Sequence, residues 1–242
     1  MKIFIISLDS SYDRRLRIAE EFSKMSLSYE FFDATSVAKL PQSFLKNYAK
    51  KKSIDLKGYA LTLGELACFH SHYQLWNKCY ESNESILVLE DNVDISEHFP
   101  SLIKDLSITL EEEKLTDNLI KLSASKDSKF KKLVSIGSSE EFFLGKYTSP
   151  TTSAMGYILS PCVAESLINN IKDFINPVDD YMEKVWLHSF KVLSMNPNLV
   201  FRADIQSTIG RGRKKKENLT IMNKLKIEIF RVFEKIKFIL FW

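Results

Sequence analysis

The chain has 242 residues, of which 45% are hydrophobic and 12% are aromatic. This length provides a sizeable core, and the scarcity of glycine and proline and the lack of repeats exclude solenoid and low-complexity proteins. The three cysteines are too few and too scattered for a disulfide framework or a zinc-ligand motif, so they favour a reducing compartment.

The formal net charge of +3 conceals an asymmetry between the two parts of the chain. Residues 1–210 contain 24 Lys and Arg against 28 Asp and Glu, a balance of −4. Residues 211–242 contain 10 against 3, a balance of +7. We therefore expect a mildly acidic domain over 1–210 and a basic tail over 211–242. The acidic domain argues against a nucleic-acid partner.

The first part of the chain predicts a strand, a helix and a second strand. Lys2–Leu8 is an apolar, strand-like run that is too short for a signal peptide or a membrane-spanning helix. Asp13–Met25 has the apolar spacing of a helix, and Tyr29–Phe32 is again strand-like. This order is typical of a parallel, right-handed β-α-β unit.

A long helix and a buried strand follow. Leu40–Lys57 is polar and lysine-rich without clear periodicity, which indicates short helices and loop. Thr62–Tyr80 predicts a helix that Thr62 caps, with Glu65 placed to complete a capping box. Ile86–Leu89 is a short apolar run bounded by polar residues, as expected of a buried strand.

The second half continues the alternation of helices and strands. We expect helices over Phe99–Leu115, Ser160–Ile171, Pro177–His188 and Leu219–Trp242, strands over Asn118–Leu122, Ala154–Leu159 and Val200–Arg202, and a hairpin or loop over Ser135–Gly145. Ser160 is placed to cap its helix, with Pro161 at the first position. The alternation predicts an α/β fold with a mixed, mostly parallel sheet flanked by helices.

An acidic turn ends the predicted strand Ile86–Leu89. It consists of Glu90, Asp91 and Asn92. In α/β sheets ligands bind at the carboxyl ends of the strands, and carboxylate and amide oxygens suit Mg²⁺ or Mn²⁺ shared with substrate phosphates. The alternative is a solvated acidic turn that only ends the strand.

Polar residues also gather where other predicted elements begin. Asp9 could accept a hydrogen bond from a base or ribose, and Arg14 or Arg15 could pair with a phosphate; alternatively, these residues lie at an exposed helix start. Asp179 and Asp180 open a helix, where either could act as a general base or simply complement the helix dipole.

The helix Thr62–Tyr80 carries further candidates. Glu65 and His72 lie about two turns apart with Ser71 adjacent, although Glu65 also fits the capping box and His72 a buried, hydrogen-bonded histidine. His70 and His72 are two positions apart and do not share a face, so a two-histidine metal site is not expected.

Six segments together resemble glycosyltransferase family 25, whose bacterial members include lipooligosaccharide galactosyltransferases. In chain order they are IFIISLDSSYDRR, LTLGELACFHSHYQLW, ILVLEDN, TSAMGYILSPCVAESLI, PVDDYM and QSTIGR. The resemblance implies a GT-A-like fold and transfer of a hexose from a UDP-sugar with inversion at the anomeric carbon. Galactose is the expected sugar, and glucose or a catalytically weak sugar-nucleotide-binding protein are the alternatives.

The resemblance also implies roles for particular residues. The donor site would comprise Asp9, Arg14, Thr62, Ser71, His72, Glu90, Asp91 and Ser207. A divalent cation, Mn²⁺ or Mg²⁺, would lie at Glu90, Asp91 and Asn92. Family members typically read Glu-Asp-Asp, so Asn92 removes one charge and leaves the metal dependence open. Asp179 would be the base, with Glu65 as the second choice.

The tail predicts an amphipathic helix whose polar side is basic. Apolar residues recur at helical spacing over Leu219–Trp242, with lysines and an arginine between them. Such a helix binds an anionic membrane surface, which suits a lipid-linked oligosaccharide acceptor, or else packs on the protein's own body or a partner. We expect a cytoplasmic protein, peripheral on the cytoplasmic face of the bacterial inner membrane.

Overall fold

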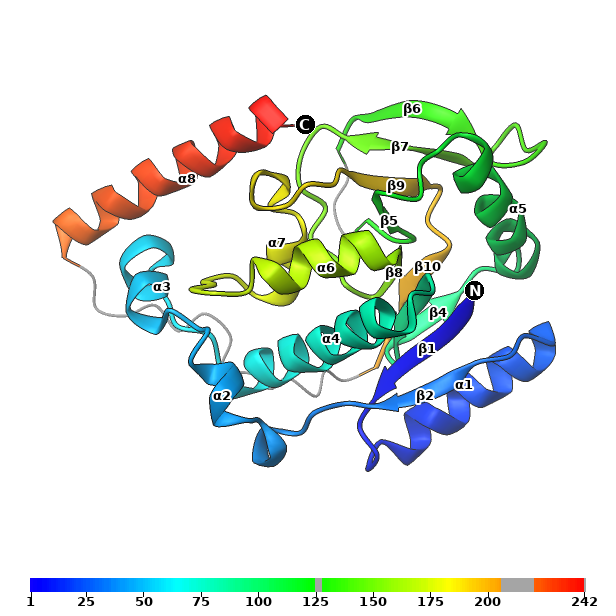
Figure 1. Cartoon of the computed structure of the whole chain (residues 1–242), viewed down its shortest axis with the longest axis horizontal. Helices are drawn as coiled ribbons and strands as arrows, with labels where there is room; N and C mark the ends of the chain where they lie inside the picture. The colour runs from blue at the N-terminus through cyan, green and yellow to red at the C-terminus, as the bar shows by residue number, and fades with distance from the viewer. Residues whose placement is uncertain (125–127, 206–219, 242) are drawn as a thin grey trace.

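The computed structural model describes residues 1–124, 128–205 and 220–241. The described residues form ten strands: β1 (Lys2–Ser7), β2 (Glu30–Asp33), β3 (Ile86–Glu90), β4 (Val93–Ile95), β5 (Leu119–Lys121), β6 (Phe130–Ser135), β7 (Phe143–Tyr147), β8 (Gly156–Leu159), β9 (Val192–Asn196) and β10 (Val200–Arg202). Eight of them form one sheet in the order β2-β1-β3-β8-β5-β9-β7-β6, while β4 and β10 pair separately (Figure 1).

Helices surround this sheet. They are α1 (Tyr12–Met25), α2 (Gln42–Leu45), α3 (Lys50–Lys57), α4 (Leu63–Ser82), α5 (Phe99–Glu112), α6 (Pro161–Asn169), α7 (Val178–Met182) and α8 (Ile221–Phe241), with 3-10 turns η1 (Val37–Lys39) and η2 (Val185–Leu187). The predicted α/β class with a mixed sheet is confirmed. β1 pairs in parallel with β2 and β3, whereas β8 runs antiparallel to β3 and β5.

Two apolar layers cover the faces of the sheet because side chains alternate along each strand. Ile86 and Val88 of β3 pack with α4 and α6, whereas Leu87 and Leu89 pack with α1 and α5. Every one of these four side chains is fully or nearly fully buried. The alternation fixes the register, so Glu90 lies at the end of β3 opposite Ile6 of β1.

The capping box of α4 is present as predicted. Thr62 Oγ1 accepts the Glu65 backbone N–H, and the Glu65 carboxylate accepts the Thr62 N–H. The predicted cap of α6 is wrong: Pro161 does open that helix, but Ser160 makes no capping bond and its hydroxyl lies 3.0 Å from Cys162 Sγ.

The predicted helix over Pro177–His188 is confirmed for its first part and wrong in its length. α7 ends at Met182, and a separate 3-10 turn follows. The two residues that follow α7, Glu183 and Lys184, are held by different partners. Glu183 binds the buried Lys121, while Lys184 Nζ lies 2.8 Å from both Asp180 and Glu234.

The C-terminal helix α8 lies against α3 and η2. Its Ile227 and Phe238 are buried, and Glu234 pairs with Lys57 and Lys184 of the body. Across the three described stretches of chain, every helix is too short or too polar to cross a membrane. The predicted boundary at residues 210 and 211 lies outside the described residues.

Candidate functional site

A pocket of about 760 Å³, open to solvent, lies where β1 and β3 end beside the start of α4. Six predicted site residues line it: Arg14, Ser71, His72, Glu90, Asp91 and Asn92. They come from the loops and helices that follow separate strands, and the parallel pairing of β1 with β3 brings them to one edge of the sheet.

Asp91 fixes a guanidinium at the pocket. Asp91 as a whole residue is 7% exposed, and both of its carboxylate oxygens accept hydrogen bonds. Ser7 Oγ donates to Oδ2 at 2.7 Å, and Arg14 Nη1 donates to Oδ1 at 2.8 Å. Because the side chains of Asp91 and Arg14 are both largely buried, the pair is weakly screened and well oriented. Arg14 is thereby held at the pocket wall, where an anionic ligand would meet it.

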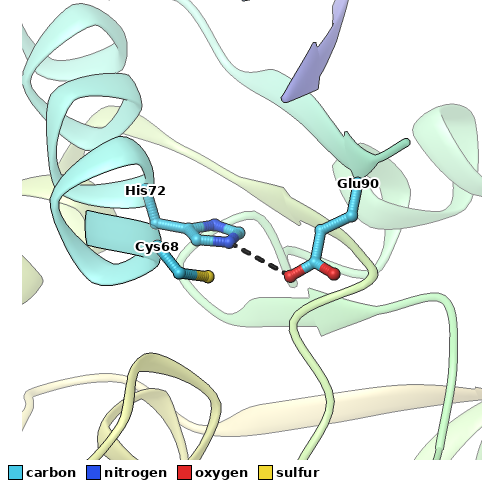
Figure 2. A group of neighbouring side chains, drawn as sticks. All are labelled: Cys68, His72 and Glu90. Atoms are coloured by element: carbon cyan, nitrogen blue, oxygen red, sulfur yellow. Dashed lines mark hydrogen bonds and ion pairs between the residues drawn. The ribbon is translucent and has the colours of Figure 1, made fainter. Parts of the chain in front are cut away.

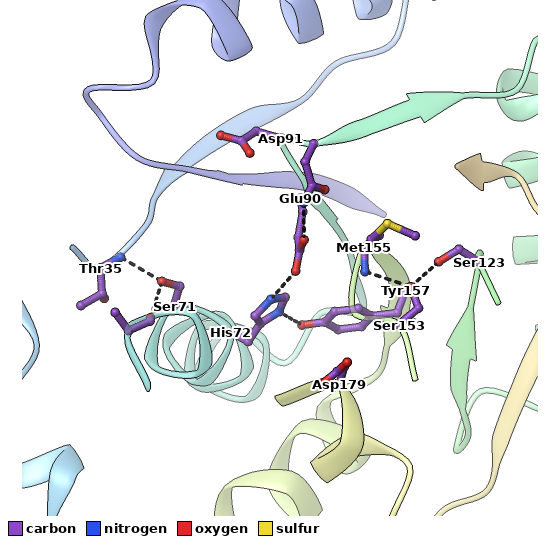
Figure 3. A network of polar contacts seen from close by, with 12 residues as sticks. Thr35, Ser71, His72, Glu90, Asp91, Ser123, Ser153, Met155, Tyr157 and Asp179 are labelled. Atoms are coloured by element: carbon purple, nitrogen blue, oxygen red, sulfur yellow. Dashed lines mark hydrogen bonds and ion pairs between the residues drawn. The ribbon is translucent and has the colours of Figure 1, made fainter. Parts of the chain in front are cut away.

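Glu90 lies between His72 and Asn92. His72 Nε2 is 3.4 Å from Glu90 Oε1, and Asn92 Nδ2 donates to Oε2 at 3.1 Å; Figure 3 shows the contact between His72 and Glu90. Burial alone would raise the pKa of Glu90, but the hydrogen bonds from His72 and Asn92 and the charges of His72 and Arg202 outweigh it and lower the pKa. Glu90 is therefore a carboxylate at neutral pH.

The side-chain amide of Asn92 offers an oxygen that could bind a cation. Its buried Oδ1 has no hydrogen-bond partner within the part of the chain that the structure describes. A buried carbonyl oxygen without a donor is costly, and a cation beside it removes that cost. Glu90 and Asn92 therefore fit an oxygen-liganded divalent cation, whereas the Asp91 carboxylate is committed to Ser7 and Arg14.

His72 is held by residues that the sequence reasoning missed. It is fully buried, and its Nδ1 lies 2.8 Å from the Tyr157 hydroxyl, which also accepts the Trp76 Nε1–H at 3.0 Å. Tyr157 comes from β8, whose antiparallel pairing with β3 no local pattern reveals. The apolar segment around Tyr157 was the available signal, because a buried tyrosine needs a hydrogen-bond partner.

Ser71 orders the segment that follows β2. Its Oγ accepts the Thr35 N–H at 2.9 Å and donates to the Ala67 carbonyl. Thr35, Ser36 and Val37 also line the pocket. The sequence did not point to this segment because Thr35, Ser36 and Val37 carry no charge.

The remaining predicted donor-site residues lie around or away from the pocket. Thr62 and Glu65 form the capping box of α4, next to the pocket-lining Gly64. Asp9 is exposed and lies 3.9 Å from Lys39 Nζ. Ser207 is outside the described residues.

The two candidate bases differ in their partners. Asp180 lies between Lys57 and Lys184, at 2.9 and 2.8 Å; burial raises its pKa, but these two cations outweigh burial and lower it. Asp179 accepts only the Asp180 N–H among the hydrogen bonds found for it in the described chain. Burial, followed by the charge of Asp180, raises the pKa of Asp179. Its carboxylate points toward Tyr157 and His72 in Figure 3.

Comparison with known proteins gives consistent matches. The model of glycosyltransferase family 25 (LPS biosynthesis protein) matches residues 1–182. The lipooligosaccharide biosynthesis protein lic2B of Haemophilus influenzae is 34% identical over 165 residues, which are 65% of this chain and 58% of that protein. A putative glycosyltransferase of Haemophilus influenzae is 26% identical over 95% of this chain and 84% of its own length.

A vertebrate enzyme also aligns with most of the chain. Procollagen galactosyltransferase 1-A of Xenopus laevis is 25% identical over 83% of this chain, although this covers only 35% of the Xenopus protein. The chain thus spans between about a third and five sixths of the length of these three relatives.

Proposed function

The chain belongs to glycosyltransferase family 25, and from this premise we propose that it transfers a hexose, galactose first, from a UDP-sugar to a lipooligosaccharide acceptor. The observation that carries the proposal is the pocket in which Arg14 and the ionised Glu90 meet at the carboxyl ends of β1 and β3. UDP-glucose is the alternative donor, and a lipopolysaccharide core is an equivalent acceptor.

The donor diphosphate would bind beside Arg14. The Asp91 carboxylate orients this guanidinium and so prepares it to pair with phosphate oxygens. Glu90 and Asn92 would hold a divalent cation, Mn²⁺ or Mg²⁺, which supplies positive charge as the diphosphate leaves. Ser71 would keep the pocket-lining segment at Thr35 in place.

The acceptor hydroxyl would be activated by Asp179. Its raised pKa makes it a better proton acceptor than an ordinary aspartate, while Asp180 is committed to two lysines. The acceptor oxygen attacks the anomeric carbon, its proton passes to Asp179, and the bond to UDP breaks on the opposite face. This displacement inverts the anomeric configuration. Glu65 is engaged in capping α4, so it is the weaker candidate.

One observation supports a second candidate function, binding of a sugar nucleotide without catalysis. Asn92 replaces a charged ligand with a neutral amide, which would weaken cation binding. A protein that binds a sugar nucleotide without turnover would show this change.

Transfer with a panel of UDP-sugars tests the proposal. The full chain is incubated with UDP-galactose, UDP-glucose and UDP-N-acetylglucosamine, with and without Mn²⁺, and free UDP and glycosylated lipooligosaccharide are measured. We expect UDP release and transfer from one UDP-hexose. Binding of a UDP-sugar with no release of UDP under any condition would favour the sugar-nucleotide-binding alternative.

The acceptor suggests a membrane surface as a further partner, through α8. Large apolar side chains stay exposed on this helix, and all of them except Phe241 share one side: Ile221, Met222, Leu225, Ile229, Val232, Phe233, Ile236, Ile239 and Leu240. At 3.6 residues per turn they occupy an arc of about 120° that faces away from the buried Ile227 and Phe238. Lysines flank this arc, as expected of a helix lying on anionic lipid. We propose that the protein binds the cytoplasmic membrane face through it.

A further inference from the structure

Three side chains that commonly bind transition metals converge on one wall of the pocket. Cys68 and His72 lie one helical turn apart on α4, and Glu90 ends β3 across from them (Figure 2). One ligand atom of each residue lies within 4.8 Å of the other two. We propose that Cys68, His72 and Glu90 form a site for a borderline-soft divalent cation such as Zn²⁺.

The separation of the ligand atoms fits such a cation. His72 Nε2 and Glu90 Oε1 are 3.4 Å apart. Two ligands bound tetrahedrally at about 2.1 Å are themselves separated by about 3.4 Å. The pair is thus already spaced as zinc ligands. Cys68 Sγ, whose bond to zinc is longer at about 2.3 Å, approaches by side-chain rotation on the same helix face.

The neighbours of His72 fix which nitrogen faces the cation. Nδ1 is occupied by the Tyr157 hydroxyl at 2.8 Å, so Nε2 faces Glu90 and Cys68. As a metal ligand, His72 donates its Nδ1–H to the Tyr157 oxygen, which also accepts from Trp76. An outer hydrogen-bond partner of this kind orients the imidazole at metal sites.

The charges and the opening of the pocket favour a cation at this place. A thiolate and a carboxylate together balance a divalent cation, while Asp91 is already neutralised by Arg14. Cys68, His72 and Glu90 all line the solvent-open pocket, so a fourth position remains for water or a phosphate oxygen. Its use for a nucleotide phosphate rests on the proposed function.

This site differs from the oxygen site at Glu90 and Asn92. Sulfur and imidazole ligands select zinc-like cations, whereas Mg²⁺ and Mn²⁺ prefer oxygen. Glu90 belongs to both sets, so only one cation binds at a time. The structure thereby predicts competition between Zn²⁺ and Mn²⁺ for Glu90.

Metal titration of the full chain tests the site without any nucleotide. The protein is treated with a chelator and titrated with Co²⁺, and then with Zn²⁺. We expect one Co²⁺ per chain, an intense near-ultraviolet absorption from thiolate ligation, and its loss when Zn²⁺ displaces Co²⁺. Cys68→Ser should abolish the absorption and weaken Zn²⁺ binding at least tenfold, and Tyr157→Phe should weaken it about 10- to 100-fold.

Cys162→Ser is the matched control. Cys162 is exposed on α6 and should leave the absorption unchanged. Circular dichroism and thermal unfolding check that Cys68→Ser remains folded. No thiolate absorption in the wild type, or absorption that survives in a folded Cys68→Ser protein, overturns the site. Transfer activity is scored separately: absorption without transfer refutes only the proposed function, and transfer without absorption refutes only this site.

Discussion

At the scale of single residues, the charged side chains of the pocket already have hydrogen-bond partners within the protein before a ligand binds. Asp91 holds Arg14, and His72 and Asn92 hold Glu90. These contacts preorganise one cationic and one anionic group at the same opening. Preorganisation matters because a site that must reorganise on binding loses affinity.

The Arg14–Asp91 pair gives a prediction for donor binding. Arg14→Lys replaces the planar guanidinium, which can bind a phosphate through two N–H groups, with a single ammonium group. Asp91→Asn removes the carboxylate charge that orients the guanidinium. Each variant should therefore weaken UDP-sugar binding about tenfold. The double variant should bind little worse than either single variant because both act through one guanidinium. Isothermal titration calorimetry measures this, and additive losses would contradict the coupling.

The raised pKa of Asp179 gives a prediction for pH. Asp179 accepts a proton only when ionised, so transfer should fall as the pH drops through its raised pKa, at a higher pH than for an ordinary aspartate. The same shift means that the folded state binds this proton more tightly, so ionisation of Asp179 opposes folding as the pH rises. Asp179→Asn should therefore keep or gain stability at neutral pH. A variant that unfolds more easily at neutral pH would argue against the burial assigned to Asp179.

At the scale of elements, α4 presents Ser71 and His72 to the pocket and begins at a capping box. Thr62→Ala removes the cap and should lower the free energy of unfolding by about 1 kcal/mol. Glu65→Gln weakens the interaction with the helix N-terminus by about 0.3–1 kcal/mol. Urea denaturation measures both. Turnover should stay within about twofold in each; a collapse of turnover in Glu65→Gln alone would make Glu65 the base.

Local sequence patterns predicted those elements whose stabilising contacts join residues close together in the sequence. The capping box predicted α4, and short apolar runs predicted β1 and β3. The helix expected over Pro177–His188 ends at Met182, and beyond it Glu183 and Lys184 pair with Lys121 and Glu234, which are distant in sequence. The spacing of apolar residues along a helix predicts which face is buried, but it does not predict ion pairs with residues that are distant in the sequence.

At the scale of the whole molecule, the sheet order gathers a site from segments that are far apart in the sequence. The acidic turn and Arg14 were predicted because the ends of parallel strands meet at one edge. Tyr157 and Thr35 were not, since their roles depend on strand and loop pairings that only the folded chain shows. The same holds for Asp180, whose lysine partners lie on α3 and after α7.

The two faces of α8 give a prediction about the membrane. Leu225→Ser with Ile229→Ser and Ile236→Ser removes part of the exposed apolar arc and should reduce co-sedimentation with anionic phosphatidylglycerol vesicles at least tenfold, because each buried apolar side chain contributes about 1.5–3 kcal/mol. Zwitterionic vesicles should bind the wild type weakly. Val37→Ser, on an exposed apolar residue away from α8, is the control. Equal binding by the triple variant would make the arc a contact for a second protein.

The central claim is that one pocket binds the donor while Asp179 activates the acceptor. Its most direct test compares UDP-galactose binding and transfer rate in wild type and Asp179→Asn, with Asp55→Asn, at a half-exposed carboxylate of α3 that pairs with Lys51, as control. The account predicts donor affinity within about twofold of wild type and a transfer rate at least about 100-fold lower in Asp179→Asn alone. Loss of donor binding in that variant, or an unchanged transfer rate, would contradict it.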